Sequence, residues 1–336
     1  MSKAIALYSG GLDSTLSVLV MKRLGVEVTA VQFDTDFGCS ISRRSGGKPT
    51  SRVPAMLRFT VETHYIGDKF IELVKNPKFG HGKNMNPCID CKALMLKEAK
   101  MLMEQRGADF LITGEVLWQR PMSQRGDTLP KIEREAGVLG LVVRPLSAKV
   151  MKPTIPEEKG LVDREKLYGM SGRSRKPQMA LAKELGLTEY PQPAGGCLLT
   201  DPIFSCRLRE LLARNSSPSK KEVQLLRMGR HFRTEDGFKI IVGRDERDNE
   251  NIQKLAGPDD YLLHVAGDYG SPLVIIETGI SDEGLNLAAA LCARYSAARK
   301  LPVVAVNVLR NSTSSLVETA PAEDADFGRF RIHPSE

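Results

Sequence analysis

Short apolar runs alternate with segments of helical periodicity along the first half of the chain. Runs rich in apolar and β-branched residues predict strands at residues 3–8, 27–34, 60–66, 109–113 and 140–144. Apolar positions three and four apart predict helices at residues 14–24, 68–75, 90–106 and 177–185. Such alternation is typical of a doubly wound parallel sheet. We therefore predict an α/β domain at 1–186, with its ligands at the carboxyl ends of the strands.

The pattern changes in the second half of the chain. Residues 187–206 are rich in proline and glycine, and we expect them to link two domains. The following elements are predicted as helices at 207–214, 219–227 and 282–299, and as strands at 238–243, 260–265, 272–277 and 302–308. They predict a smaller α+β domain at 207–310. The polar segment 311–336 is expected to be a flexible tail.

Composition places the chain among ordinary globular proteins. It has 336 residues, of which 41% are hydrophobic and 26% charged. No apolar run approaches the ~20 residues that a membrane span needs, and the N-terminal residues lack the layout of a signal peptide. We therefore predict a cytoplasmic protein with no membrane partner. The net charge is +7, and the basic excess is concentrated in residues 37–61, 171–183 and 205–233, which suits a polyanion such as RNA as well as a solvated face.

The stretch YSGGLDST at 8–15 joins the first predicted strand to the first helix. Adjacent Gly10 and Gly11 let the chain turn sharply and leave backbone N–H groups uncovered. A helix that begins near Asp13 adds further unpaired N–H groups, and Ser9 and Ser14 add hydroxyl groups. Together they predict a cradle for a phosphate-type anion. The alternative is an ordinary strand–turn–helix connection with Asp13 as the N-cap.

SGGLDS resembles the pyrophosphate loop of the PP-loop, or adenine nucleotide α-hydrolase-like, ATPases. These enzymes have a Rossmann-like sheet and cleave ATP between its α and β phosphates, so that AMP is transferred. The resemblance implies that the nucleotide is held by Ser9, Gly10, Gly11, Asp13 and Ser14. It also implies that Asp13 is catalytic and helps to place Mg²⁺.

Six cysteines stand at 39, 88, 91, 197, 206 and 292. In a chain with no sign of secretion, metal binding or redox chemistry is favoured over structural disulfides. Cys88 and Cys91 lie at the predicted start of a helix, which favours thiolates. A single CxxC fits a zinc half-site, a redox pair or part of an iron–sulfur site. Cys39 and Cys292 are interpreted as a loop thiol and a small buried hydrophobe.

The cysteine pattern resembles that of tRNA 2-thiouridine synthases, which also carry an Asn-Pro segment ending in cysteine and a second cysteine far downstream. Cys88, Cys91 and Cys197 would make three thiolates, as in the tRNA-thiolation enzymes that hold a [4Fe–4S] cluster. Such a cluster leaves one iron free to bind the sulfur that is transferred. A structural zinc on these cysteines with Cys206 or His81 is one alternative, and a persulfide relay between Cys91 and Cys197 is another.

Two further stretches resemble tRNA 4-thiouridine synthases. TGEVLWQRPMSQ at 113–124 is similar to a TGESLGQ-type stretch of that family, and RPL at 144–146 also fits its pattern. The resemblance implies that Thr113 and Gly114 belong to the nucleotide site.

Residues 228–308 resemble the NFACT-R domain, which is an RNA-binding domain. The candidates for phosphate contact in it are Arg230, His231, Arg233 and Arg244, with Arg43 and Arg44 in the first basic stretch.

These resemblances together predict an ATP-dependent tRNA sulfurtransferase of the thiouridine synthase type. A base oxygen would be adenylated and replaced by sulfur, with Asp13, Cys88, Cys91 and Cys197 as the catalytic residues. The expected partners are tRNA and a sulfur donor protein or inorganic sulfide, and a homodimer is allowed. The alternatives are a small-molecule sulfurtransferase or desulfurating enzyme, a PP-loop ligase with a structural zinc, and an RNA-binding protein with a relic ATPase domain.

Overall fold

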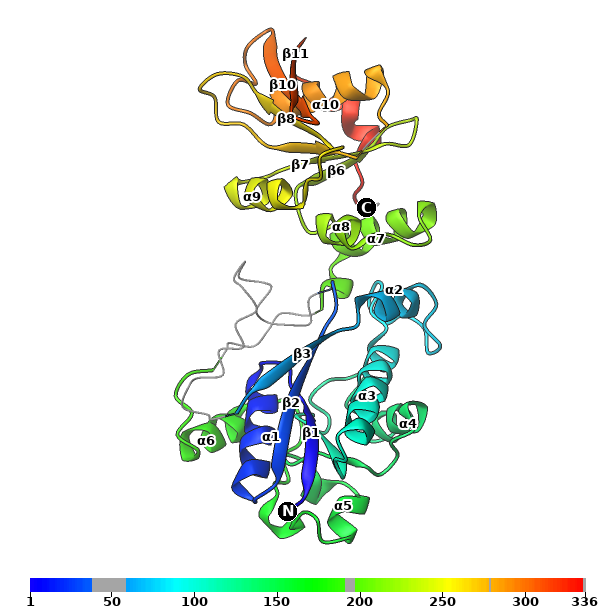
Figure 1. The fold of residues 1–336 in the computed structure, drawn as a ribbon, viewed down its shortest axis with the longest axis vertical. Helices are drawn as coiled ribbons and strands as arrows, with labels where there is room; N and C mark the ends of the chain where they lie inside the picture. The colour runs from blue at the N-terminus through cyan, green and yellow to red at the C-terminus, as the bar shows by residue number, and fades with distance from the viewer. Residues whose placement is uncertain (38–58, 191–196, 278, 335–336) are drawn as a thin grey trace. The chain divides into compact units, whose positions relative to one another are not determined.

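The structure of the chain is a computed structural model that describes residues 1–37, 59–190, 197–277 and 279–334. It divides into two compact units, Met1–Asp201 and Pro202–Glu336, each with its own sheet and core (Figure 1). No helix in these described ranges is long and apolar enough to cross a membrane.

The first unit is built on a five-stranded parallel sheet of order β3-β2-β1-β4-β5. Its strands are β1 (Lys3–Leu7), β2 (Glu27–Asp34), β3 (Val61–Tyr65), β4 (Phe110–Thr113) and β5 (Val142–Val143). The chain runs outward from β1 to β3 and then returns to β4 on the other side of β1. The order therefore reverses between β1 and β4, and a crevice for ligands is expected at the carboxyl ends of these two strands.

The helices of the unit are α1 (Leu12–Arg23), α2 (Gly67–Lys75), α3 (Cys88–Gln105), α4 (Thr128–Ala136), α5 (Ile155–Glu158) and α6 (Lys176–Glu184). Of these, α1 and α6 cover one face of this sheet, and α3 and α4 cover the other (Figure 1). Successive residues of β1 serve opposite cores: Ala4 and Ala6 pack with α1 and α6, whereas Ile5 packs with α3 and α4. The predicted α/β fold with a doubly wound parallel sheet is confirmed.

The second unit contains a six-stranded antiparallel sheet of order β11-β10-β8-β9-β7-β6. The strands are β6 (Arg230–Arg233), β7 (Lys239–Val242), β8 (Tyr261–Val265), β9 (Val274–Ile276), β10 (Val304–Arg310) and β11 (Thr313–Thr319). The helices are α7 (Pro202–Arg214), α8 (Lys220–Leu225), α9 (Glu246–Leu255), α10 (Asp282–Arg294) and α11 (Asp324–Phe327). Residues of α10 join one core of this unit, and residues of α8 and α9 join another. This is the smaller α+β domain that the sequence predicts.

Two expected segments need correction. Residues 311–336 are not a flexible tail as predicted, because β11 pairs with β10 along its full length and Ala322 and Phe327 are buried in the core. Most side chains of β11 are exposed on an edge strand, so its sequence carries little apolar signal. The expected link at 187–206 also ends in ordered structure, since α7 begins at Pro202.

Candidate nucleotide and sulfur site

The SGGLDS loop leaves β1 at the predicted crevice and enters α1. Gly10 adopts a φ of +75°, a conformation that glycine allows without steric cost. The helix begins at Leu12, so its N-cap is Gly11 and not Asp13. The hydroxyl groups of Ser9 and Ser14 lie 3.1 Å apart, and Ser14 Oγ donates to the Gly11 carbonyl at 2.9 Å. The loop is thus a compact turn at a helix N-terminus, the arrangement that favours an anion.

The end of β4 packs directly on this loop. A Cβ atom placed on Gly114 would lie 2.5 Å from the Ser14 backbone nitrogen and 2.7 Å from the Asp13 carbonyl carbon. Only glycine permits such a close approach. The structure therefore places Gly114, which follows Thr113, against the loop.

Asp13 carries an unpartnered oxygen. Its Oδ1 atom is buried and has no hydrogen-bond partner among the described atoms. Burial raises the pKa of the Asp13 carboxyl, while a hydrogen bond from Gln119 and the charges of Arg175 and Arg120 act in the opposite direction. A free carboxylate oxygen beside an anion cradle fits the hard-oxygen coordination of Mg²⁺. Asp13 is therefore a suitable ligand for the magnesium ion of a bound MgATP.

Glu115, the residue after Gly114, belongs to a buried network of ion pairs. Glu115 pairs with Lys92 of α3 and accepts from Arg144 Nε at 3.0 Å, and Arg144 also pairs with Glu133 at 2.5 Å. Burial alone would raise the pKa of Glu115, but the charges of Lys92 and Arg144 hold it at about 2. Glu115 and Arg144 lie in stretches that the sequence singles out, but neither residue is assigned a role from the sequence. The available signal is a charged residue one or two positions after each buried strand.

The CxxC cysteines occupy the first turn of α3. Cys88 is the first helical residue and Cys91 follows three residues later. Both residues are partly exposed. The buried Asn86 donates from Nδ2 to Cys88 Sγ at 3.1 Å. This hydrogen bond fixes the position of the sulfur at the start of α3.

The segment that carries Cys197 is bound to the loop before Cys88. The Met85 backbone N–H donates to the Leu199 carbonyl at 3.0 Å, and Asn84 Nδ2 donates to the Thr200 carbonyl at 2.8 Å. Two stretches more than a hundred residues apart in sequence are therefore joined next to the predicted cysteines.

The structure does not assemble the predicted metal sites. Within the described part of the chain, no three side chains of His, Cys, Asp or Glu lie so that they could hold a metal ion. The three cysteines as placed therefore do not form the ligand set of a [4Fe–4S] cluster. The zinc alternative with His81 is not assembled either, because His81 Nε2 is hydrogen-bonded to the Val74 carbonyl.

The candidates for RNA contact differ in their availability. His231 is 1% exposed, and burial together with the charges of Lys239 and Arg207 lowers its pKa well below the usual value. A neutral, buried imidazole cannot contact phosphate, so this assignment is corrected. Arg233 is bound at both ends of its guanidinium by Glu210, at 2.7 and 2.9 Å.

The other two arginines among these candidates, Arg230 and Arg244, are not buried. Arg244 is paired with Asp248 but half exposed, and Arg230 stacks on the ring of Tyr295 at 4.3 Å. Arg43, Arg44 and Cys39 lie outside the described residues.

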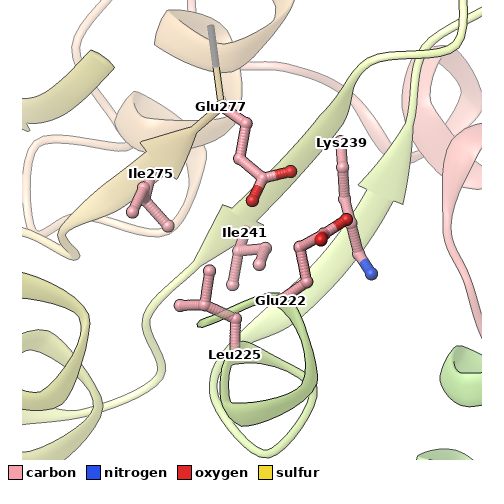
Figure 2. Close-up of a pocket in the computed structure, with 6 residues that line it drawn as sticks. All are labelled: Glu222, Leu225, Lys239, Ile241, Ile275 and Glu277. Atoms are coloured by element: carbon pink, nitrogen blue, oxygen red, sulfur yellow. The ribbon is translucent and has the colours of Figure 1, made fainter. Parts of the chain in front are cut away.

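A small polar pocket in the second unit is lined by Glu222, Leu225, Lys239, Ile241, Ile275 and Glu277 (Figure 2). Burial lowers the pKa of Lys239 to about 8 and raises the pKa of Glu277. Its volume of about 10 Å³ is that of a single water position, so it is not a substrate site.

Comparison with known proteins divides the chain in the same way. Residues 1–155 match the family model described as thiamine biosynthesis protein (ThiI), and residues 229–331 match the NFACT protein RNA binding domain. A probable tRNA sulfurtransferase of Thermococcus kodakarensis is 28% identical over 125 residues, which cover 35% of this chain and 30% of the relative. A tRNA-specific 2-thiouridylase MnmA 2 of Clostridium botulinum is 30% identical over 122 residues, which cover 34% and 35%. The matches thus span about a third of the length of these relatives.

Solved structures show weaker likeness. A 4-thiouridine synthetase in complex with RNA and ATP is 22% identical, with 55% of this chain and 52% of that chain covered and a TM-score of 0.32. The C-terminal part of a fibronectin/fibrinogen-binding protein from Streptococcus suis is 17% identical, with coverage of 79% and 97% and a TM-score of 0.28. The sequence matches confirm the predicted resemblance: the chain is similar to PP-loop tRNA thiolation enzymes in its first part and to the NFACT RNA-binding domain in its last part.

Proposed function

We propose that this chain is an ATP-dependent tRNA sulfurtransferase of the thiouridine synthase type. The observation that carries the proposal is the position of the tripeptide Thr113–Glu115. On one side, Gly114 packs against Asp13 and Ser14 of the nucleotide loop. On the other, Glu115 pairs with Lys92, which directly follows Cys91. A nucleotide loop and a cysteine pair that share one supporting tripeptide can act on the same substrate.

The first step is the activation of a base. A carbonyl carbon of a pyrimidine is a poor electrophile, so its oxygen must first become a leaving group. Attack of this oxygen on the α phosphate of ATP gives an adenylated base and pyrophosphate. The loop Ser9–Ser14 would hold the pyrophosphate, and the charges of Arg120 and Arg175 near Asp13 would stabilise it. Bound Mg²⁺, held by Asp13, would neutralise part of the phosphate charge.

The second step is the attack by sulfur. The hydrogen bonds from Asn84 and Met85 bring the Cys197 segment to the cysteine loop and favour a relay between cysteines. The outer sulfur of a persulfide on Cys197 attacks the activated carbon, and AMP departs with the oxygen. The thiolate of Cys91 then attacks the inner sulfur, the base keeps the outer one, and a disulfide between Cys91 and Cys197 remains. A dithiol reductant and a donor protein carrying sulfane sulfur return the enzyme to its starting state.

A [4Fe–4S] cluster on Cys88, Cys91 and Cys197 is the other route that the sequence predicts. No step is assigned to it, because the three cysteines are not gathered as metal ligands. Anaerobic purification with iron and sulfide assays decides between the two routes. Iron-free protein that thiolates tRNA at the full rate excludes the cluster, whereas activity proportional to bound iron excludes the relay.

The likeness of residues 229–331 to an RNA-binding domain supports tRNA as the substrate. Arg230 and Arg244 are proposed as phosphate contacts, with Arg43 and Arg44 in the first basic stretch. A cytoplasmic location and a homodimer stay predictions.

The test is a reconstituted reaction with ATP, a persulfide donor and unfractionated tRNA from a strain that lacks the gene. Thiolated nucleosides are measured by mass spectrometry, and AMP and pyrophosphate are measured in the same samples. Asp13→Asn should abolish pyrophosphate, AMP and thiolated nucleoside, whereas Cys197→Ser should stop thiolation and AMP release while pyrophosphate still forms in the first step. Cys206→Ser is the matched control and should behave as the unchanged protein. AMP formation at the same rate with and without tRNA would contradict the proposal.

A further inference from the structure

Trp118 is the single tryptophan of the chain and lies in the loop that follows β4. Its backbone has a φ of +65°, and the residue is 48% exposed. A bulky residue in the left-handed region is strained, and exposing an indole to water adds a second unfavourable term. Glycine would remove both costs, so the indole is retained against local stability.

The loop around Trp118 is closely held. The Trp118 N–H donates to the Gln124 carbonyl at 2.7 Å, and the Gln124 N–H donates to the Arg120 carbonyl at 3.2 Å. Ser123 and Gln124 are both buried. The exposure of the indole therefore does not come from a loose segment.

This loop touches both halves of the proposed site. Gln119, the next residue, is hydrogen-bonded to Asp13 of the nucleotide loop. The end of the Met122 side chain packs on Gly82, where a Cβ atom would lie 2.6 Å from the Met122 sulfur. Gly82 in turn donates to the carbonyl of Asn86, whose side chain donates to Cys88. The loop that carries Trp118 therefore contacts both the nucleotide loop and the segment that leads to Cys88.

We propose that the indole of Trp118 stacks on a base of the RNA acceptor and holds it out of its own stack at the reaction site. The inference rests on the proposed function. A planar, exposed ring next to the exposed Arg120 is the chemistry that binds unstacked bases. The contact also offsets the free energy of extruding the base. Trp118 is thereby a positioning and specificity residue for the acceptor.

The single tryptophan allows a direct test with the full chain. Adding unfractionated tRNA should quench its fluorescence, whereas adding ATP alone should not. Trp118→Gly should raise the Kd and KM for tRNA by about 5- to 150-fold, the loss of one base stack. The Kd of this variant for ATP should not change. Its thermal midpoint should stay equal or rise, because glycine adopts this φ without steric strain. Trp118→Phe should restore most of the tRNA affinity, and Leu139→Ala, at another exposed apolar position, should have no effect.

Other outcomes overturn the inference. A lower thermal midpoint with unchanged tRNA affinity in Trp118→Gly would make the indole a packing residue. Quenching by ATP with no response to tRNA would assign it to the adenine. One outcome separates this inference from the proposed function. If the unchanged protein thiolates no tRNA, but tRNA still quenches its tryptophan fluorescence and Trp118→Gly binds tRNA more weakly in a filter-binding assay, the proposed function fails and the stacking contact stands.

Discussion

The side chain of Asn86 donates a hydrogen bond to the sulfur of Cys88, over 3.1 Å, at the point where α3 begins. The amide is buried, so water does not compete for this contact. The hydrogen bond holds the sulfur in one position at the start of the helix. The pair gives Cys88 an environment that the cysteine spacing alone does not predict.

Asn86→Ala should speed the alkylation of Cys88, because the amide no longer occupies a lone pair of the sulfur and the smaller side chain covers it less. The loss of one hydrogen bond costs about 0.5–1.5 kcal/mol, which corresponds to a rate raised by about 2- to 12-fold. The measurement is iodoacetamide labelling at pH 7.5, followed by peptide mass spectrometry. The peptides of Cys91 and Cys206 in the same digest serve as internal references. Equal labelling of Cys88 in both proteins would show that the amide has no influence on its sulfur.

Gly114→Ala should disrupt the nucleotide loop. The added methyl group would fall 2.5 Å from the Ser14 backbone nitrogen, which leaves no room unless α1 or the end of β4 moves. Overpacking of this kind costs about 1–3 kcal/mol, so we expect ATP to bind at least about fivefold more weakly by calorimetry. Gly126→Ala is the control, because its nearest neighbour lies at an ordinary 3.7 Å. ATP affinity unchanged in Gly114→Ala would argue against the loop as the nucleotide site.

The ion pairs of Glu115 make a prediction about pH. The folded-state pKa of about 2 lies below the value of about 4.3 for glutamate in an unfolded chain. The ionised carboxylate therefore adds stability above pH 4.3, and this stability is lost as the pH falls toward 2. Glu115→Gln leaves Lys92 without its partner and Arg144 with Glu133 alone, and should lower the free energy of unfolding at pH 7 by about 3–5 kcal/mol.

Urea unfolding of both proteins between pH 7 and pH 3.5 checks this prediction. The difference should be constant above about pH 5.5 and should shrink below about pH 4.5. Glu104→Gln is the control, since Glu104 forms an exposed pair with Lys100 and should change stability by less than about 1 kcal/mol. A difference that does not depend on pH would mean that the lost stability comes from packing.

Local patterns in the sequence predicted the sheet and the nucleotide loop. Buried parallel strands are short apolar runs, and Gly10 and Gly11 mark the turn after β1, so both features can be recognised without tertiary information. α4 was missed because its Pro130 signals a break, although proline is tolerated in the first turn of a helix.

Such local patterns do not predict which residues far apart in the sequence pair with one another. Lys92, Glu115 and Arg144 meet only because α3, β4 and β5 pack together, and nothing local to each residue specifies its partner. The contact of Asn84 with Thr200 likewise joins segments 116 residues apart. The cysteines and the basic residues could be recognised as candidates from the sequence. Which of them lie close together, form ion pairs or are buried depends on the fold.

His231 shows this limit and yields a prediction. The stretch RHFR, in which His231 stands among arginines, has a composition typical of an exposed segment. His231 is nevertheless buried, and its Nε2 donates to the Met228 carbonyl. Its lowered pKa means that only the unfolded chain binds the proton near pH 6.5, so the second unit should lose about 1.4 kcal/mol of stability per pH unit below that value. His231→Gln should flatten this slope in hydrogen exchange of the β7 amides and leave tRNA affinity at pH 7.5 unchanged. The exposed His333→Gln should keep the slope, and weaker tRNA binding by His231→Gln in a folded unit would restore His231 as an RNA contact.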